Sequence, residues 1–240
     1  MKTIKQKSGV CCMMLALVIL CAVSCTKPDD DNSNGTATIG SYNGYEYIDL
    51  GLPSGTLWAT CNVGASAPED HGGYYAWGET TTKDTYSWLT TYKWCNGSSF
   101  TLTKYCNQSY YGYNDFTDNL TMLLPEDDAA TANWGIGWCT PTIEDWEELR
   151  QNTTNTWTVQ NGVNGLLLKA KNGGTLFLPA AGHRWGDELK ESDFGFYWSS
   201  TLGVEIPSCA AHFYFNSDYF YGSYFGERNY GKSVRAVLRK

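Results

Sequence analysis

The chain has 240 residues, of which 42% are hydrophobic, 18% charged and 15% aromatic. This composition excludes a wholly disordered chain, and the length fits one large domain or two small ones. The 25 acidic residues outnumber the 17 basic residues and give a net charge of −8. That balance argues against non-specific binding of nucleic acid, so no nucleic-acid partner is predicted.

Residues 1–24 have the pattern of a secretory signal peptide. Three lysines precede an apolar, uncharged run from Val10 to Val23. About 14 apolar residues are too few to cross a bilayer of roughly 30 Å as a helix, but they fit the apolar part of a signal. The run ends in Ala22-Val23-Ser24-Cys25. Small residues before a cysteine resemble the lipobox of bacterial lipoproteins, which implies cleavage and lipidation at Cys25; ordinary signal cleavage nearby is the alternative.

Residues 25–41 are predicted to be a flexible acidic tether, because they are polar and show no periodicity. The acidic run Asp29-Asp30-Asp31 also resembles the signals that export lipoproteins of the Bacteroidota to the cell surface. The sequence therefore predicts an outer-membrane lipoprotein, exposed on the cell surface, whose lipid anchor makes the membrane a partner. A plain linker that faces the periplasm is the alternative.

Residues 42–240 are predicted to form one α+β domain of short antiparallel strands, one or two short helices and long loops. Strands are expected at 45–50, 57–62, 74–77, 166–170, 175–178, 210–215 and 233–238. Asn172-Gly173-Gly174 predicts a hairpin turn between the fourth and fifth of these. Residues 80–120 are rich in Thr, Tyr, Asn, Ser and Gly, which is typical of long loops.

The best helix signal covers residues 142–150. Thr142 can cap this helix, acidic residues crowd its first turn, and Arg150 lies in its last turn. Ile143, Trp146 and Leu149 recur every three residues and give one apolar stripe. A shorter helix is expected over 126–133.

Five cysteines remain after Cys25, and this odd number leaves at least one thiol free. An exported protein can form disulfides. Cys95 and Cys106 flank a turn-rich loop and are the candidate disulfide, which would contribute roughly 3 kcal/mol in the chain-entropy model. Metal binding is the alternative use of cysteine, but no CxxC or HxxxH spacing occurs, so neither a metal nor a cofactor is predicted.

Several blocks, in order along the chain, resemble the Fibrobacter succinogenes major paralogous domain family. The blocks are Leu50–Ala59, Tyr75–Glu79, Trp138 with Pro141-Thr142 and Trp146, Leu178–Arg184, Tyr197–Thr201 and Gly231–Arg235. The resemblance covers about Tyr45 to Arg239 and implies a C-type-lectin-like fold, related in outline to sulfatase-modifying enzymes. Cys139 departs from the pattern, because the family often has Arg at that position. The family name implies no biochemical activity.

Aromatic side chains in loops are the candidate ligand-binding residues, because their faces stack on sugar C–H groups. One group lies between residues 86 and 113 and the other between 219 and 225. The candidates are Tyr86, Trp88, Tyr92, Trp94, Tyr110, Tyr111, Tyr113, Tyr219, Tyr221 and Tyr224. A role in covering the core is the alternative for each ring. Trp58, Trp77, Trp146 and Trp198 are expected in the core.

No catalytic set is found, and the sequence predicts a non-enzymatic protein. The three histidines are isolated and no Gly-x-Ser-x-Gly motif occurs. Arg184, Arg228 and Arg235 are expected to pair with Asp187, Asp193 or Glu227. The favoured function is a surface-anchored recognition module that binds a glycan or a protein. A structural protein of the cell envelope, or an enzyme distantly related to sulfatase-modifying enzymes, are the alternatives.

Overall fold

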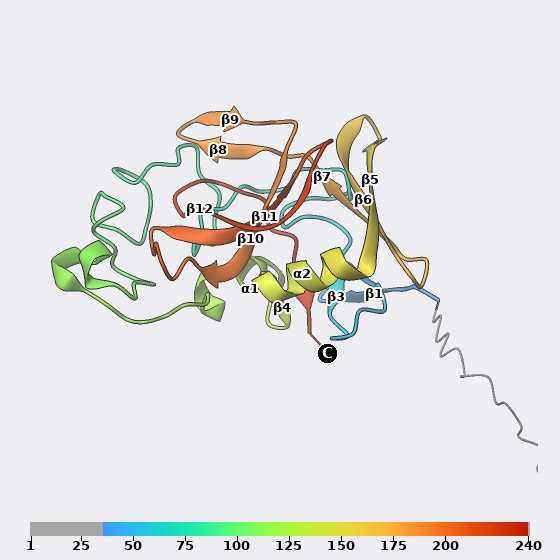
Figure 1. Ribbon diagram of the computed structural model, residues 1–240, viewed down its shortest axis with the longest axis horizontal. Coiled ribbons are helices and arrows are strands. Elements are labelled where there is room, and N and C mark those ends of the chain that lie inside the picture. Colours follow the sequence, from blue (N-terminus) through green and yellow to red (C-terminus); the bar gives the residue numbers. More distant parts are fainter. Residues whose placement is uncertain (1–35, 240) are drawn as a thin grey trace, which may run out of the picture. The chain divides into compact units, whose positions relative to one another are not determined.

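The computed structural model describes residues 36–239 (Figure 1). The predicted signal peptide, Cys25 and most of the predicted tether lie outside these residues. Strands dominate the described part of the chain, every strand pair is antiparallel, and the helices are short. The α+β prediction with short helices is therefore confirmed. Within residues 36–239, no helix combines the length and hydropathy needed to cross a membrane.

A five-stranded sheet joins the start and the end of the described chain. In spatial order its strands are β1 (Thr38–Tyr42), β2 (Tyr45–Asp49), β3 (Leu57–Ala59), β13 (Val237–Leu238) and β4 (Trp138–Cys139). Val237 pairs with both Trp58 and Cys139, so β13 closes the gap between β3 and β4. Strand β1 begins at Thr38, inside the segment predicted as tether. That boundary was wrong because pairing with β2 orders residues whose composition alone reads as a linker.

A second sheet consists of two hairpins in series: β5 (Thr153–Gln160), β6 (Val163–Ala170) and β7 (Thr175–Pro179). The predicted turn at Asn172-Gly173-Gly174 connects β6 and β7, and Asn172 Oδ1 accepts a hydrogen bond from Gly174 N at 3.0 Å. The β5–β6 turn at Asn161-Gly162 has positive φ at both residues. This is the type I′ geometry that Asn-Gly favours.

The third sheet places the candidate site and consists of β10 (Gly195–Leu202), β11 (Cys209–Phe215) and β12 (Phe220–Glu227). Side chains alternate between its two faces. Phe213 and Tyr197 lie on the inner face, where Phe213 stacks on Trp146 of α2 (Ile143–Asn152) at 4.7 Å. The opposite face carries Phe196, Trp198, His212, Tyr214 and Tyr224. A small two-stranded sheet, β8 (His183–Trp185) and β9 (Glu188–Lys190), lies beside that face (Figure 1).

Helix α2 confirms its sequence prediction. Thr142 Oγ1 accepts a hydrogen bond from Asp145 N at 3.2 Å, and Asp145 Oδ2 accepts one from Thr142 N at 2.7 Å, which is a capping box. The shorter predicted helix is divided into a 3-10 turn at Pro125–Asp127 and α1 (Ala129–Trp134). The remaining 3-10 turns are Ser109–Tyr111 and Tyr113–Asp115, within the predicted long loops. Trp58, Trp77, Trp146 and Trp198 are all buried in the core, as predicted.

Three predicted segments differ from the structure. Residues 74–77 form a single bridge between Tyr75 and Lys232 rather than a strand, and only 237–238 of the segment 233–238 are a strand. Residues 220–227, expected as a loop, form β12. Its Gly and Ser residues read as loop residues, but pairing with β11 decides the conformation.

Two buried arginines tie the long loops to the sheets, but not through the carboxylates that the sequence suggested. Arg228 donates to Tyr92 Oη and to the backbone carbonyls of Lys104, Tyr105 and Pro207. Arg235 likewise donates to Asn62 Oδ1 and to backbone carbonyls of Ala59, Thr60 and Phe177. Arg184 donates to the backbone carbonyl of Asp187 at 3.3 Å. The predicted carboxylate pairs were wrong, because these guanidinium groups donate mainly to backbone carbonyls of loops and strands.

Candidate functional site

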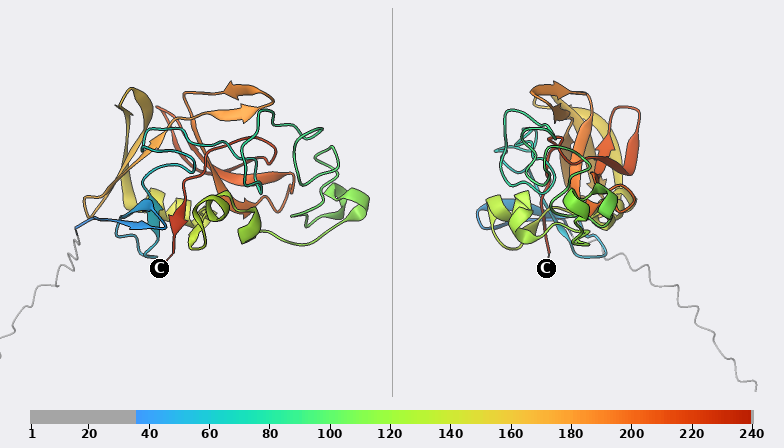
Figure 2. Two further views of the ribbon diagram at one scale, coloured as in Figure 1. Left: turned by 180° about the vertical axis from the view of Figure 1, so that it is seen from behind. Right: turned by 90° about the vertical axis from the view of Figure 1, so that its left-hand side faces the viewer.

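Three hollows border the β8–β9 hairpin, each lined by different residues of it. The long loop lies beside the hairpin in Figures 1 and 2, and Tyr86 N donates to Gly186 O at 2.8 Å to join them. Alternation along β8 directs His183 and Trp185 to one side, where both rings contact Tyr230, and Arg184 to the other. Arg184 therefore lines one hollow on its side of the hairpin, whereas His183 and Trp185 each line a different hollow on the other side.

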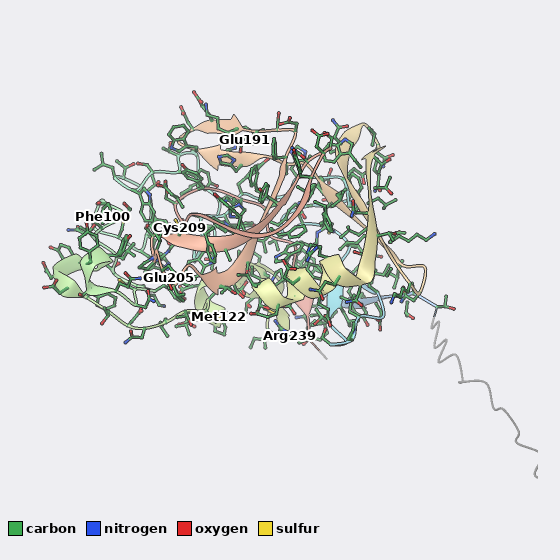
Figure 3. The ribbon with its side chains drawn as sticks, in the orientation of Figure 1. Phe100, Met122, Glu191, Glu205, Cys209 and Arg239 are labelled. Atoms are coloured by element: carbon green, nitrogen blue, oxygen red, sulfur yellow. The ribbon has the colours of Figure 1, made fainter. Side chains whose placement is uncertain are left out.

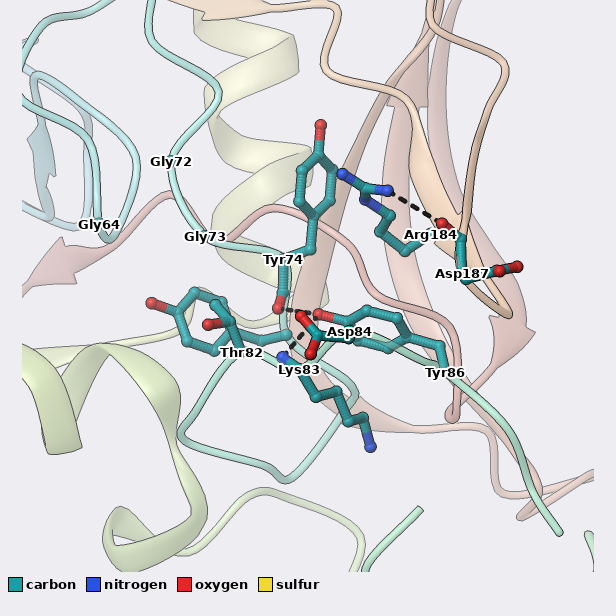
Figure 4. Close-up of a pocket in the computed structure, with 11 residues that line it drawn as sticks. Gly64, Gly72, Gly73, Tyr74, Thr82, Lys83, Asp84, Tyr86, Arg184 and Asp187 are labelled. Carbon is teal, nitrogen blue, oxygen red and sulfur yellow. Dashed lines mark hydrogen bonds between the residues drawn. The ribbon is translucent and has the colours of Figure 1, made fainter. Parts of the chain in front are cut away.

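The polar hollow has a volume of about 800 Å³ and is lined by Tyr74, Asp84, Arg184 and Asp187, among others (Figure 4). The Arg184 guanidinium lies 5.3 Å from the centre of the Tyr74 ring. Tyr86 Oη donates to Tyr74 O at 2.5 Å and closes part of the wall. Arg184 thus stacks on Tyr74 and donates to the Asp187 backbone carbonyl, and the described residues of the lining offer no second exposed aromatic ring beside it.

The tryptophan cleft is defined by Trp88, Leu89, Trp185, Glu227 and Asn229 and has a volume of about 430 Å³. Trp185 is 55% exposed, and Trp88 Nε1 donates to Glu227 Oε2 at 3.4 Å. Asn229 is buried, and within the described residues its Oδ1 accepts no hydrogen bond. Two indole rings beside a carboxylate and an amide are the combination that binds sugars, because the rings cover C–H groups and the polar groups meet hydroxyls.

The lysine cleft lies on the outer face of the third sheet and has a volume of about 340 Å³. Its walls are aromatic, and its floor holds Lys232 and His212. The lining residues are His183, Glu191, Phe194, Phe196, His212, Tyr214, Tyr224, Phe225, Gly226, Tyr230 and Lys232. Lys232 Nζ donates to His212 Nδ1 at 2.9 Å and lies 4.1 Å from the centre of the Trp198 ring.

Burial suppresses charge in the lysine cleft. Desolvation first, and then the charge of Lys232, hold the pKa of His212 well below its ordinary value. The same two causes, with Lys190, lower the pKa of His183 to about 4. Desolvation also holds the pKa of Lys232 well below its ordinary value. Both imidazoles are therefore neutral at neutral pH.

The structure divides the candidate aromatic residues of the long loop. Tyr86 and Tyr92 are buried, and Tyr92 Oη donates to Trp77 O at 2.8 Å. Tyr92 lines none of the three hollows, whereas Tyr86 forms part of the wall of the polar hollow and of the tryptophan cleft. They fill the core because few aliphatic side chains are available in this loop. Trp94 is half-buried under Lys93, with its Nε1 donating to Gly78 O at 2.6 Å. Trp88 and Tyr86 are the candidates from this loop that line the tryptophan cleft, and Trp88 is the less buried of the two.

A separate exposed cluster contains Tyr110, Tyr111 and Phe100, whose rings lie 5.3 to 5.6 Å apart. Tyr113, which is 42% exposed, lies close to it in the sequence. Phe100 lies well away from Glu191, which borders the lysine cleft, in Figure 3. These rings form a surface cluster and not part of the hairpin site.

The second group of candidates lies on or next to β12. Tyr224 is 61% exposed and lines the lysine cleft, and Tyr219 is 53% exposed just before the strand. The side chain of Tyr221 lies outside the described part of the chain.

The predicted disulfide is absent, and all five cysteines of the described residues are free thiols. Cys95 Sγ donates to Trp88 O at 3.2 Å, and Cys106 Sγ donates to Gln108 O at 3.1 Å. Proximity in the sequence was the basis of the prediction, but each thiol instead meets a carbonyl in its own turn. Burial raises the pKa of both thiols.

Sequence reasoning missed the residues that make the two clefts. No local pattern indicated that Trp185, Phe196 and Lys232 line a cleft. A lysine after a glycine is expected to be exposed, and a single tryptophan is expected in the core. His212 was interpreted as structural. The alternation of residues 210–215 could have placed His212 and Tyr214 on one face, but not the hairpin or Lys232 opposite them.

No group of three or more His, Cys, Asp or Glu side chains within residues 36–239 is arranged to hold a metal ion. Comparisons of the chain with protein-family models, with curated proteins and with solved structures found no match.

Proposed function

We propose that this protein is a surface-anchored outer-membrane lipoprotein that acts as a non-catalytic recognition module and binds a glycan in the tryptophan cleft. The observation that carries the proposal is the pairing of exposed Trp185 with half-buried Trp88 beside Glu227 and Asn229. Each ring offers a flat apolar face, while the two polar side chains offer hydrogen-bond acceptors to hydroxyls.

The family resemblance gives the proposal its fold: a Fibrobacter succinogenes major paralogous domain with a C-type-lectin-like architecture. Three of the resembling blocks pack together, which supports it. Tyr197 Oη donates to Pro179 O at 2.8 Å, Trp198 N donates to Ser233 O at 3.0 Å, and Arg235 donates to Phe177 O at 3.0 Å. Blocks that are far apart in the sequence thus form one core.

The enzyme alternative has less support. Burial raises the pKa of Cys61, Cys139 and Cys209, as it does for the other two described thiols, and this favours the unreactive thiol form. In the described part of the chain, no bond joins any two cysteines. A cysteine-dependent mechanism would need a thiolate or a close cysteine pair.

Glycan arrays test the binding proposal. The purified full-length protein in detergent should bind at least one glycan class, and Trp185→Ala should weaken that binding about tenfold or more, the loss expected for one stacked ring. Tyr110→Ala is the matched control, because it removes an exposed ring, 75% exposed against 55% for Trp185, from the separate cluster. No binding to any glycan would reject the sugar ligand and leave a protein partner.

Metabolic labelling tests the anchor. Cells that express the full chain should incorporate labelled palmitate into this protein, and Cys25→Ser should abolish the incorporation. Digestion of intact cells by an added protease should then remove the domain. Protection from the protease would place the domain in the periplasm instead.

A further inference from the structure

The lysine cleft contains a buried cation without an acidic partner. Three cationic side chains of the described residues are almost wholly buried: Arg228, Arg235 and Lys232. Each arginine donates to four oxygen atoms. Lys232 Nζ donates only to the ring nitrogen of His212, and it takes part in none of the ion pairs of the described residues. Buried cations in proteins are normally paired.

Its neighbours cannot supply the missing negative charge. His212 and His183 are neutral or cationic groups, and their charges oppose that of Lys232. Cys209, Glu191 and Glu227 favour the charged lysine from a distance, but none forms an ion pair with it. Tyr230 keeps its proton, because burial raises its pKa to about 12.

Gly226 on β12 lets the lysine amine pack directly against the strand. A Cβ at this position would lie 2.5 Å from Lys232 Nζ and 2.9 Å from His212 Cε1. Lys232 is only 2% exposed, and it lines the cleft. Around it, the exposed Tyr224 ring and the buried Phe196 ring form apolar walls.

We propose that the lysine cleft binds a carboxylate carried on a six-membered ring, with the carboxylate paired to Lys232 Nζ and the ring held between the aromatic walls. A single ring fits a cleft of about 340 Å³. A carboxylate is favoured over phosphate or sulfate because the floor offers one cationic donor, and because Glu191 at the rim repels a more highly charged anion. Sugar acids and aryl acids share this chemistry.

Ligand binding also changes the protonation of Lys232. The bound carboxylate supplies the negative charge that the ligand-free cleft lacks. Binding therefore raises the pKa of Lys232, and protein molecules whose amine was neutral take up a proton. The other titratable groups of the described residues that face Lys232 are His183, His212, Cys209, Glu191, Glu227, Tyr214, Tyr224 and Tyr230. The site is distinct from the tryptophan cleft and does not depend on the glycan proposal.

Calorimetry with matched probes tests the inference. Full-length protein in detergent is titrated at about pH 8 with galacturonate and galactose, and with benzoate and benzyl alcohol, in two buffers of different ionisation enthalpy. At least one acid should bind at least tenfold more tightly than its uncharged partner, with proton uptake. Which acid binds distinguishes a sugar acid from an aryl acid.

Variants link the binding to the lysine. Lys232→Met should bind the acid about tenfold or more weakly than the wild type and should show no proton uptake. The control variant Lys169→Met, on the exposed side of β6, should bind the acid like the wild type. If Lys232→Met fails to fold, Tyr224→Ala, which truncates the exposed wall, should weaken binding of the same acid. Failure of both acids to bind, or full binding by Lys232→Met, would overturn the carboxylate site while leaving the Trp185 result unaffected.

Discussion

Replacing Lys232 by methionine should stabilise the fold near neutral pH and destabilise it in alkali. Methionine is similar in length to lysine and matches the Trp198 and Phe196 rings around Nζ, which lie 4.1 and 5.7 Å away. Replacing buried ionic groups with apolar ones of similar volume often stabilises by about 1–4 kcal/mol. Against this, the loss of the donor to His212 Nδ1 costs about 1–3 kcal/mol. We expect a net gain of about 1 kcal/mol at about pH 7.

The dependence on pH identifies the cause. The folded-state pKa of Lys232 lies well below its unfolded value, because burial disfavours the charged amine. Between these two pKa values the unfolded chain binds one more proton, so the wild type loses stability as pH falls and recovers it as pH rises toward about 10.4. The folding equilibrium of the wild type should therefore improve by up to about tenfold per pH unit relative to Lys232→Met.

Urea unfolding of wild type, Lys232→Met and Lys169→Met at several pH values from about 7 to about 10 measures this difference. The advantage of Lys232→Met should shrink with rising pH and change sign in the most alkaline samples. Lys169 is exposed, so its variant should follow the wild type at every pH. If Lys232→Met is less stable than the wild type by the same amount at all pH values, the inference that the Lys232 amine is unpaired and desolvated is wrong.

Three further outcomes follow from the contacts. Asp128→Ala should destabilise the fold by about 3 kcal/mol in urea unfolding, because Asp128 caps α1 and accepts hydrogen bonds from Thr140 N and Oγ1 at 2.8 Å. The control variant Asp84→Ala replaces an exposed residue and should change the free energy of unfolding little. Arg235→Met should lower the free energy of unfolding by at least about 3 kcal/mol, because it leaves four acceptors of Arg235 without their donor. Arg239→Met loses a half-exposed ion pair with Asp145 and should lower it by less than about 1 kcal/mol. Equal losses in the two variants would contradict the burial argument. Alkylation of the protein unfolded in denaturant, without reductant, should label Cys95 and Cys106, because both are free thiols. Peptide mapping that finds the two cysteines joined would contradict this and support the disulfide.

Local patterns predicted the elements whose geometry is set by a few adjacent residues. Thr142 and Asp145 are three apart, so their capping box forms within one helical turn whatever packs on it. Asn172 to Gly174 likewise form a turn from their own backbone preferences. The pattern failed at β12, where Ser223 and Gly226 are typical loop residues but pair with β11. A long-range ladder outweighs weak local preferences.

The candidate site depended on tertiary structure more strongly. Composition identified the excess of aromatic residues, and two of the candidates chosen from it, Trp88 and Tyr224, line a cleft in the structure. It could not separate them from Tyr86 and Tyr92, which have the same residue type and the same kind of neighbours but are buried. Exposure follows from which segment covers a ring, and the covering segments lie far away in the sequence.

The sequence by itself determined the strand-rich α+β class, the long loops, helix α2 and the core tryptophans, because hydrophobic pattern and local turn chemistry act over a few residues. The tertiary structure alone decided that three hollows border β8–β9 and that Lys232 meets His212 without forming an ion pair among the described residues. Those two residues are twenty positions apart. They approach each other because the segment after β12 runs back alongside edge strand β10, where Ser233 N donates to Phe196 O at 3.2 Å. Burial and charge pairing at Lys232 depend on the packing of these distant segments, so no local sequence pattern predicts them.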